Sequence, residues 1–193
     1  MKAAIEKTTT IEALLGMLSL GAMSGYAIRQ TIEGSIGNFW RESYGQIYPT
    51  LKRLVGEGLA EIRPERTEAA GREGRTVYGL TAAGKRRLRA WLETSSTPQV
   101  PRNEMLLKIF FAAQGSPGVV RRQVEAFRSM HEGELKRFAG IRKHLEREYA
   151  RHPELSYWLI TLEYGEVESE AMLAWCERTL RTCERLEEVE HAS

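Results

Sequence analysis

The segment from residue 43 to residue 57 constrains the fold of this chain more than any other. Read as a helix, it places four apolar side chains on one stripe with helical spacing, namely Ile47, Leu51, Leu54 and Val55. Its other faces carry an amide, phenols and cations, on Tyr44, Gln46, Tyr48, Lys52 and Arg53. Such an outer face can contact both base edges and phosphates. The segment therefore predicts a DNA recognition helix, with Ser43 at its N-cap.

Pro49 lies inside this predicted helix, where a proline typically costs about 3 kcal/mol. Gly45, four residues earlier, has a permissive backbone that can absorb the distortion. The alternative is that regular helix begins only near Pro49 and that residues 43–48 form a looser turn. The sequence leaves both alternatives open.

Two helices are predicted before the recognition helix. Thr9 and Glu12 have the spacing of a capping box, which would open the first helix, and Gly21 would end it. Ser24 is the predicted N-cap of the second helix. No stretch here or elsewhere is apolar for long enough to span a bilayer, so we expect no membrane association and a cytoplasmic location.

Two strands and a helix are predicted after the recognition helix. Residues 59–65 and 76–80 read as strands, joined by a polar segment that contains Arg72 and Arg75 between glycines. Thr81 would cap a helix that reaches about Leu92, with Leu88, Trp91 and Leu92 on its apolar side. The order helix, helix, helix, strand, strand, helix predicts a winged helix-turn-helix, with Arg72 and Arg75 at the tip of the wing.

The charge distribution agrees with this prediction and argues against catalysis. Residues 1–97 carry 14 Lys and Arg against 10 Glu, whereas the rest of the chain is slightly acidic, and a basic half suits phosphate attraction. All 26 acidic residues are Glu, which excludes Asp-based catalytic triads and Asp-based metal or phosphoryl-transfer sites. The four histidines and two cysteines show no metal-ligand spacing. We therefore expect no enzyme activity, no metal and no cofactor.

Several motifs resemble the PadR family of bacterial transcriptional regulators. They are Gly25-Tyr26, the run from Gly45 to Leu54, Glu57-Gly58-Leu59, and the run from Tyr78 to Gly84. The resemblance covers about residues 11–92 and implies a homodimeric regulator, usually a repressor, that a ligand releases from its operator. The wing departs from the family pattern, because Glu73 and Gly74 interrupt the basic residues between Arg72 and Arg75. The long C-terminal half resembles the longer-tailed subgroup of the family.

A polar, proline-containing linker at residues 94–101 divides the chain into two predicted domains, 1–97 and 98–193. The second domain should be all-helical and should serve dimerisation and effector sensing. Its predicted helices run over 104–113, from an N-cap at Ser116 and Pro117 to about 151, and from Pro153 to about 189. The fold class expected for the whole chain is mainly α.

The last predicted helix carries a heptad seam of four residues, Leu173, Cys176, Leu180 and Cys183. We expect this seam to pair two subunits, because a two-fold dimer presents recognition helices about 34 Å apart, one turn of DNA. The cysteines lie about 10.5 Å apart along a helix, too far for an intrachain disulfide. They are interpreted as small apolar residues, and the alternative is an interchain thiol switch.

Aromatic residues are concentrated in the C-terminal half. They suggest a pocket for a small aromatic or hydrophobic effector, lined by Phe110, Phe127, Trp158 and Trp175, although aromatic residues at helical spacing are usually core residues. His131 likewise fits a core histidine. The main hypothesis is a dimeric DNA-binding regulator that binds a palindromic operator. The alternative is a winged-helix protein-interaction module without DNA binding, for which the recognition face would be neutral or acidic.

Overall fold

The computed structural model describes residues 2–64, 76–96, 102–116 and 118–191, with side chains described from residue 9 to residue 185 within these ranges. It divides into two compact units, residues 1–98 and 99–193, each of which is described by itself. The boundary lies within the segment that the sequence analysis took as a linker. Among the described residues, no helix combines the length and the apolar character needed to cross a bilayer.

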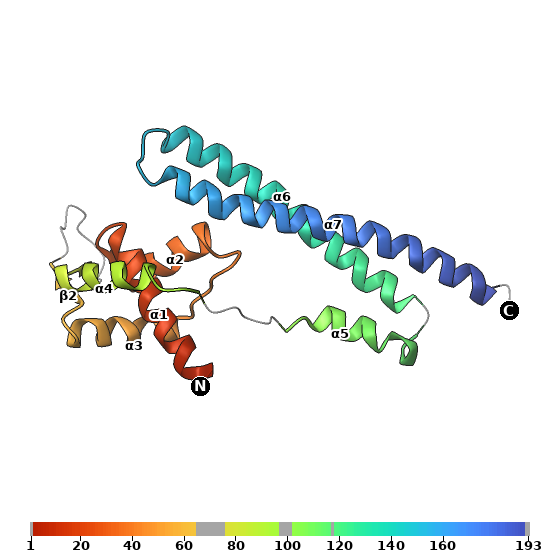
Figure 1. Ribbon diagram of the computed structural model, residues 1–193, viewed down its shortest axis with the longest axis horizontal. Helices are drawn as coiled ribbons and strands as arrows, with labels where there is room; N and C mark the ends of the chain where they lie inside the picture. The colour runs from red at the N-terminus through yellow and green to blue at the C-terminus, as the bar shows by residue number, and fades with distance from the viewer. Residues whose placement is uncertain (1, 65–75, 97–101, 117, 192–193) are drawn as a thin grey trace, which may run out of the picture. The chain divides into compact units, whose positions relative to one another are not determined.

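The first unit is a helical domain with a small sheet (Figure 1). Its elements in chain order are α1 (Lys2–Ser19), β1 (Met23–Ser24), α2 (Gly25–Ser35), α3 (Tyr44–Gly56), β2 (Ala60–Arg63), β3 (Val77–Leu80) and α4 (Ala82–Leu92). The antiparallel strands are ordered β1-β3-β2, so the central strand is the last in the chain. The winged helix-turn-helix fold expected from the sequence is confirmed, with β1 as an addition too short for any sequence pattern to reveal.

The core of the first unit is formed where α1, α2 and α3 meet. The side chains with no exposed surface come from all three helices, and they are Leu14, Leu15, Ile28, Ile47, Leu51 and Leu54. Leu59, Ala60 and Leu80 close this core from the sheet. Burying side chains of this size stabilises a domain by about 1.5 to 3 kcal/mol each, so the core fixes how α3 is held against α1 and α2.

Helix caps in this unit follow the sequence predictions at three of four positions, one of which is Ser43 at the start of α3. The Ser24 hydroxyl accepts from the Ala27 amide at 3.2 Å, and the Thr81 hydroxyl accepts from the Gly84 amide at 3.1 Å. The predicted capping box at Thr9 and Glu12 is wrong, because α1 begins at Lys2 and both residues lie inside it. Glu12 is instead buried, with a partner on a distant helix.

Two smaller expectations about this unit are also corrected. The first strand is shorter than predicted, because β2 covers only Ala60–Arg63. The apolar side assigned to the last helix is largely outside the core, since Trp91 is 39% exposed and Leu92 is 64% exposed. Only Leu88 of the three predicted residues packs against the core.

The second unit is all-helical, as expected. It consists of α5 (Glu104–Phe110), a short 3-10 turn η1 (Ala112–Gln114), α6 (Val119–Glu148) and α7 (Leu155–His191). The two long helices lie side by side as an antiparallel pair (Figure 1). The predicted cap at Ser116 and Pro117 is wrong, because Gly118 is the N-cap of α6 and has a left-handed backbone with φ 72°.

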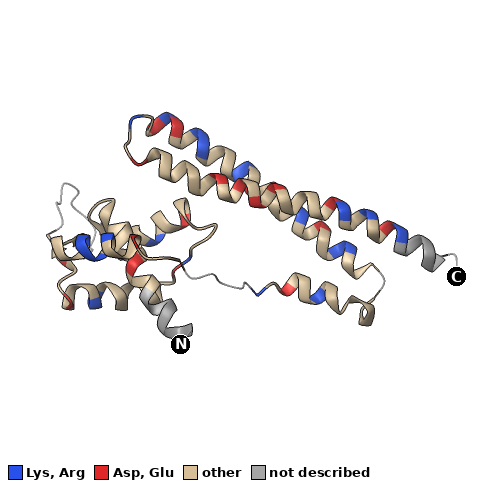
Figure 2. Ribbon diagram, in the orientation of Figure 1, with Lys and Arg blue, Asp and Glu red and all other residues tan. Residues whose placement is uncertain are grey.

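Apolar and ionic contacts hold the helix pair together. Val124 of α6 and Cys176 of α7 have no exposed surface and belong to the same apolar cluster. Ile109 of α5 packs against this cluster. Further along the pair, Arg142 bonds Glu166 across the two helices. Charges of both signs are spread over the outer surface of α6 and α7 (Figure 2). The inner face of the pair is therefore buried, and its outer surface carries charges of both signs together with exposed apolar side chains such as Ile160 and Val167.

Candidate nucleic-acid interface

The recognition helix predicted from the sequence is α3, and it is regular from its first turn. Ser43 has the extended backbone of an N-cap, and its carbonyl accepts from the amides of Gln46 and Ile47, both at 2.9 Å. Pro49 lies inside the helix, on the exposed side. The looser turn considered for residues 43–48 is therefore wrong, and Pro49, which has no amide hydrogen, donates no bond to the Gly45 carbonyl.

The exposed face of α3 has a glycine and a proline at its centre, with polar side chains around them. Glycine and proline occupy the middle at Gly45 and Pro49, so the backbone itself can approach a groove closely. The exposed polar side chains around this centre are Ser43, Gln46, Tyr48, Lys52 and Arg53. Opposite them, the buried stripe of α3 faces α1 and α2. This division between faces is what a helix in the major groove requires.

Gln46 has two roles in this geometry. Its side-chain carbonyl accepts from the Ser43 amide at 3.2 Å and from the Ser43 hydroxyl at 2.9 Å, so it caps the start of α3. The carbonyl end of the amide is therefore engaged within the helix. The Nε2 end is the part of the side chain that can donate to an acceptor on a base edge.

The rings of Tyr44 and Tyr48 stack on each other at the start of α3. Their ring centroids are 6.0 Å apart, and Tyr48 is 49% exposed although Tyr44 is half-buried. The Tyr48 ring lies so close to Gly25 of α2 that a Cβ there would sit 2.8 Å from the ring. Gly25 is thus needed at this contact, and Tyr48 is anchored to α2 while presenting its outer edge.

Arg29 of α2 joins this surface and is not among the DNA-binding residues predicted from the sequence. Its guanidinium carbon lies 4.3 Å from the centre of the Tyr44 ring, and its Nε is 2.6 Å from Glu33. The hydrogen bond to Glu33 raises the pKa of Arg29. The Arg-x-x-x-Glu spacing in α2 would have revealed the ion pair but not the stacking, because no local pattern relates residue 29 to residue 44.

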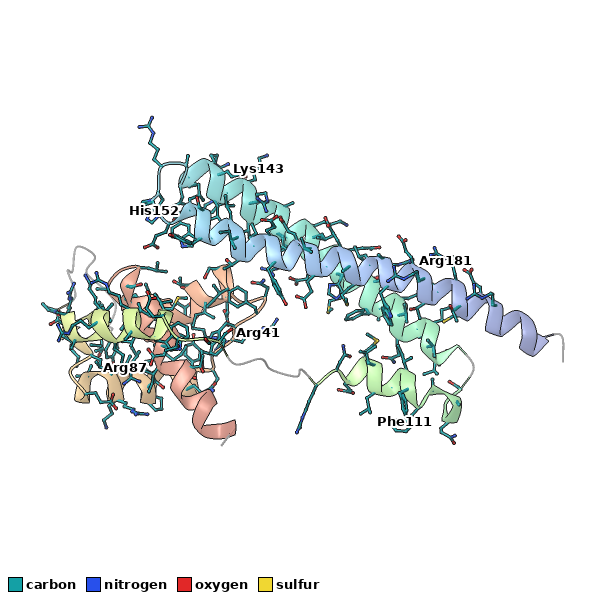
Figure 3. All side chains as sticks on the ribbon, in the orientation of Figure 1. Arg41, Arg87, Phe111, Lys143, His152 and Arg181 are labelled. Carbon is teal, nitrogen blue, oxygen red and sulfur yellow. The ribbon has the colours of Figure 1, made fainter. Side chains whose placement is uncertain are left out.

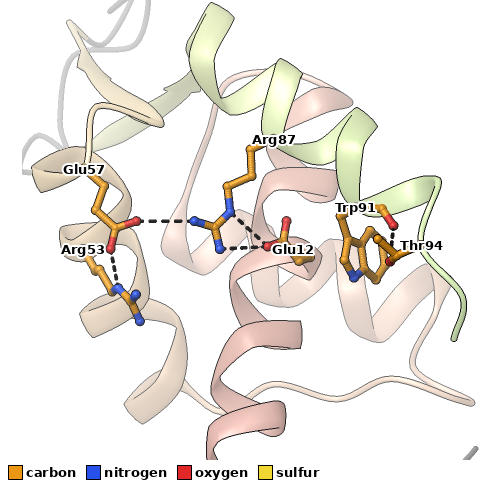
Figure 4. A network of polar contacts seen from close by, with 6 residues as sticks. All are labelled: Glu12, Arg53, Glu57, Arg87, Trp91 and Thr94. Carbon is orange, nitrogen blue, oxygen red and sulfur yellow. Dashed lines mark hydrogen bonds and ion pairs between the residues drawn. The ribbon is translucent and has the colours of Figure 1, made fainter. Parts of the chain in front are cut away.

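A chain of charged side chains connects α3 to α1 and α4. Arg87 projects from α4 (Figure 3), and its guanidinium bonds the buried Glu12 of α1 from Nε at 3.0 Å and Nη2 at 2.9 Å. On the other side, Arg87 Nη1 is 3.7 Å from Glu57, which in turn binds Arg53 at 2.6 Å (Figure 4). Glu57 therefore restrains the exposed Arg53 and ties the end of α3 to α4.

The remaining predicted DNA-binding residues belong to the wing. Arg72 and Arg75 lie outside the described residues. At the end of β2, Arg63 pairs with Glu61 at 3.0 Å and its guanidinium covers Gly79 of β3. The described part of the hairpin thus brings one further cation toward the wing.

The seam predicted on the last helix is buried within the chain itself. Cys176 has no exposed surface, Leu180 is 9% exposed and Cys183 is 5% exposed, while Leu173 is half-buried. Cys176 and Leu180 pack with Val124 of α6. Burial raises the pKa of the Cys176 thiol, which disfavours the reactive thiolate. The predicted heptad residues do lie on one face of α7, but this face packs against α6 of the same chain. Cys176 and Leu180 are therefore already buried within a single subunit.

The structure brings together only two of the four residues assigned to an effector pocket. Phe127 and Trp175 meet edge to face with ring centroids 6.1 Å apart. The ring centroids of Phe127 and His131 are 4.4 Å apart, also edge to face. Trp158 instead stacks on His152 near the turn between α6 and α7, and Phe110 is 80% exposed on α5. Within the described ranges, no three potential metal-ligating side chains come together.

Two family models match the chain, one over each unit. Residues 14–90 match the transcriptional regulator PadR-like family, and residues 101–184 match the C-terminal domain of the virulence activator alpha type. The negative transcriptional regulator PadR of Bacillus subtilis (strain 168) is 36% identical over 100 residues, which are 51% of this chain and 54% of that protein. The match thus spans about half the length of that relative.

Other relatives match over more of their length. The probable transcriptional regulator Rv1176c of Mycobacterium tuberculosis (strain ATCC 25618 / H37Rv) is 28% identical over 68% of this chain and 74% of that protein. The crystal structure of Bacillus subtilis PadR in complex with operator DNA is similar with a TM-score of 0.75 and 26% identity, covering 90% of this chain and 98% of that one. The same protein in complex with p-coumaric acid gives a TM-score of 0.71 at 24% identity, covering 92% of this chain and 96% of that one. Together with the fold, these matches show that residues 14–90 form a domain of the transcriptional regulator PadR-like family, and that residues 101–184 match the virulence activator alpha C-terminal model.

Proposed function

We propose that this protein is a sequence-specific DNA-binding transcriptional regulator, a repressor that binds a palindromic operator as a homodimer and is released by a ligand. The observation that carries the proposal is the division of α3 into a buried stripe and an exposed face with Gln46, Lys52 and Arg53. Arg29 adds a cation stacked at the start of that helix. Cations can bind phosphates while the amide contacts a base edge.

The relatives support this function. Bacillus subtilis PadR, which shares the fold over 90% of this chain, has been crystallised with operator DNA. Regulation of transcription also implies that the protein acts in the cytoplasm, where bacterial operators lie, and the proposal includes no catalytic reaction. A winged-helix interaction module is the competing function, and a cationic α3 surface is the observation that disfavours it.

Selection from a random duplex library with the full chain tests the proposal directly. We expect enrichment of an inverted repeat whose half-sites are centred about one helical turn apart, roughly 34 Å. Replacing Lys52 and Arg53 by Ala should then weaken binding to the selected duplex by about tenfold or more, because two phosphate contacts are lost. The control is Lys85→Ala, an exposed cation on α4. Recovery of no shared sequence by the unsubstituted protein would refute the proposed function and favour the interaction module.

We further propose that the releasing ligand is a small aromatic or hydrophobic compound bound by the C-terminal unit. The contact between Phe127 and Trp175, together with the half-buried His131, supplies aromatic surface beside a polar group. Operator titrations with and without p-coumaric acid, the compound bound by Bacillus subtilis PadR, provide a first probe. Release that Trp175→Ala abolishes, without a change in helix content, would support this site. Equal release from both proteins would place the site elsewhere.

A further inference from the structure

An acidic residue stands at the end of α3, where helix electrostatics disfavour one. Glu57 is the C-cap of α3, and the C-terminal end of a helix dipole is negative, so a carboxylate there is repelled. Glu57 also follows Arg53 by four residues, which is the less favourable order of acid and base along a helix. Helix stability alone therefore does not account for an acid at this position.

The backbone holds Glu57 in a fixed place. Its amide donates to the Arg53 carbonyl at 2.9 Å. The next residue, Gly58, has a left-handed backbone with φ 69°, and the Leu59 amide donates back to the Leu54 carbonyl at 2.8 Å. Leu59 and Leu54 both belong to the core of the first unit. The Glu57 side chain thus projects from a closed turn that is anchored in the core.

The Glu57 carboxylate contacts two arginines, one with each oxygen. Oε1 is 2.6 Å from Arg53 Nε, whereas Oε2 is 3.7 Å from Arg87 Nη1 (Figure 4). The short contact is therefore the one to Arg53, whose side chain is 55% exposed. Arg87 is itself fixed by two hydrogen bonds to the buried Glu12. A chain of contacts runs from the core of the domain to one exposed guanidinium.

This contact leaves part of the Arg53 guanidinium available. Glu57 accepts from Nε, and the terminal nitrogens Nη1 and Nη2 keep their N–H donors. These donors can bind a phosphate while Nε stays on Glu57. The neighbouring Lys52 is also exposed, but no carboxylate in the described part of the chain pairs with it. The outer face of α3 thus presents two adjacent cations, one held in place and one able to turn.

We propose that Glu57 is a specificity-determining residue of DNA binding, which positions Arg53 for an operator phosphate and weakens binding to unrelated DNA. At the operator, a phosphate in line with the terminal nitrogens meets a side chain that is already ordered, so little rotamer entropy is lost. On an unrelated duplex the base edges do not match α3, so its cations have to rearrange to reach phosphates. Glu57 opposes that movement, because Arg53 would leave the carboxylate unpaired beside the DNA backbone.

The inference rests on the proposed function, since it names a residue that separates operator from unrelated DNA. Glu57→Gln keeps an oxygen that can accept from Arg53 Nε but removes the charge. Titrations of the selected operator and of an unrelated duplex of equal length give the ratio of the two affinities. We expect Glu57→Gln to bind the unrelated duplex more tightly, and the ratio to fall by about three- to tenfold.

The matched control is Glu93→Gln, at the exposed C-cap of α4. It changes the net charge by the same amount, so it should shift both affinities alike and leave the ratio unchanged. A Glu57→Gln ratio equal to that of the control would overturn the inference.

A double-mutant cycle tests whether Glu57 acts through Arg53. In an Arg53→Ala background, Glu57→Gln should change the ratio no more than the control does, because the side chain that it positions is gone. In a Lys52→Ala background, the full effect of Glu57→Gln should remain. An equal fall of the ratio in the Arg53→Ala and Lys52→Ala backgrounds would overturn the positioning role, since a general change in the fold of the domain acts in both.

A measurement on the free protein separates this inference from the proposed function. NMR relaxation of the Arg53 Nε–H group should show restricted motion in the unsubstituted protein and in Glu93→Gln, and increased motion in Glu57→Gln. A mobile Arg53 in the unsubstituted protein would overturn the inference whatever DNA the protein selects. A restricted Arg53 in a protein that selects no operator would refute the proposed function, and the role in specificity with it. An operator-selecting protein whose ratio does not respond to Glu57→Gln would refute the inference alone.

Discussion

Arg87 holds the carboxylate of Glu12 through two hydrogen bonds to a single oxygen, from Nε at 3.0 Å and from Nη2 at 2.9 Å. The Glu12 side chain is only 4% exposed, and its other oxygen has no hydrogen-bond partner among the described residues. The pair joins α1 to α4, and through Glu57 it reaches α3. Because a buried carboxylate without a cation is costly, this contact holds the helices around α3 in one arrangement.

Removing the cation should therefore destabilise the first unit. We expect Arg87→Met to lower the free energy of unfolding by about 2 to 3 kcal/mol, toward the low end for a buried pair because Arg87 itself is 35% exposed. Urea denaturation followed by circular dichroism measures the change. Arg89→Met, an exposed cation on the same helix, serves as the control. Adding Glu12→Met to Arg87→Met should restore much of the loss, and equal loss in the single and double variants would contradict the pairing argument.

The contact between Arg29 and Tyr44 predicts a role for α2 in DNA binding. Arg29→Ala removes a cation beside the start of α3 and frees the Tyr44 ring. We expect weaker binding to all duplexes, with a salt slope reduced by about 0.9 if Arg29 contacts one phosphate. Fluorescence anisotropy at several salt concentrations measures both quantities. Arg41→Ala removes another exposed cation of the same domain for comparison, and an unchanged slope in Arg29→Ala would confine Arg29 to a structural role.

Local signals were sufficient to predict most of the first unit. Ser24, Ser43 and Thr81 were identified as caps because capping depends on residues within one turn of helix. The apolar spacing of α3 likewise predicted its buried stripe. Glu12 was misassigned because its partner Arg87 lies far away in the sequence, and no local pattern distinguishes a capping carboxylate from one that is paired across the core. Arg29 was missed for the same reason.

The second unit shows a different limit of sequence patterns. The heptad of Cys176 and Leu180 was found, but it is filled by Val124 of the same chain. Two faces of α7 repeat every seven residues, and periodicity alone does not say which of them meets α6. Burial in the structure shows which face meets α6, because Cys176 and Leu180 are covered by α6 whereas Ile160 and Val167 are exposed. Charge at Leu180 should consequently disrupt the helix pair itself.

The geometry of Gln46 predicts that its replacement has two separable effects. Gln46→Ala removes the carbonyl that accepts from Ser43, which should cost about 0.5 to 1 kcal/mol of stability, and it removes the Nε2 donor. We expect relaxed preference at one base position per half-site, measured by operator selection. Ser43→Ala disturbs the same cap without removing the donor, so it should weaken binding without changing the consensus. An identical consensus for Gln46→Ala and the unsubstituted protein would rule out base contact by this residue.

Burial of His131 predicts that the stability of the second unit depends on pH. Burial lowers the pKa of His131 below its ordinary 6.5, against the opposing charges of Glu168 and Glu134. The folded unit therefore favours neutral imidazole, and the unfolded chain binds more protons as the pH falls below about 6.5. The unfolding free energy should be largest above this pH and should decline below it. His131→Asn should reduce that decline, whereas His144→Asn, an exposed control, should leave it unchanged, and equal profiles for both would contradict the assignment.

The basic residues of the wing lead to a prediction from the sequence alone, since Arg72 and Arg75 lie outside the described residues. Replacing both by Ala should weaken binding to operator and to unrelated duplexes by similar factors, because phosphate contacts carry no base information. The salt slope should fall by about 0.9 for each lost contact, so by about 1.8 if both residues bind phosphates. Anisotropy titrations between low and physiological salt measure the slope, and Arg63→Ala at the end of β2 tests whether the described part of the hairpin contributes. A double variant with an unchanged slope and altered preference would mean that the wing contacts bases, whereas no change in either would leave α3 and Arg29 as the whole phosphate-binding surface.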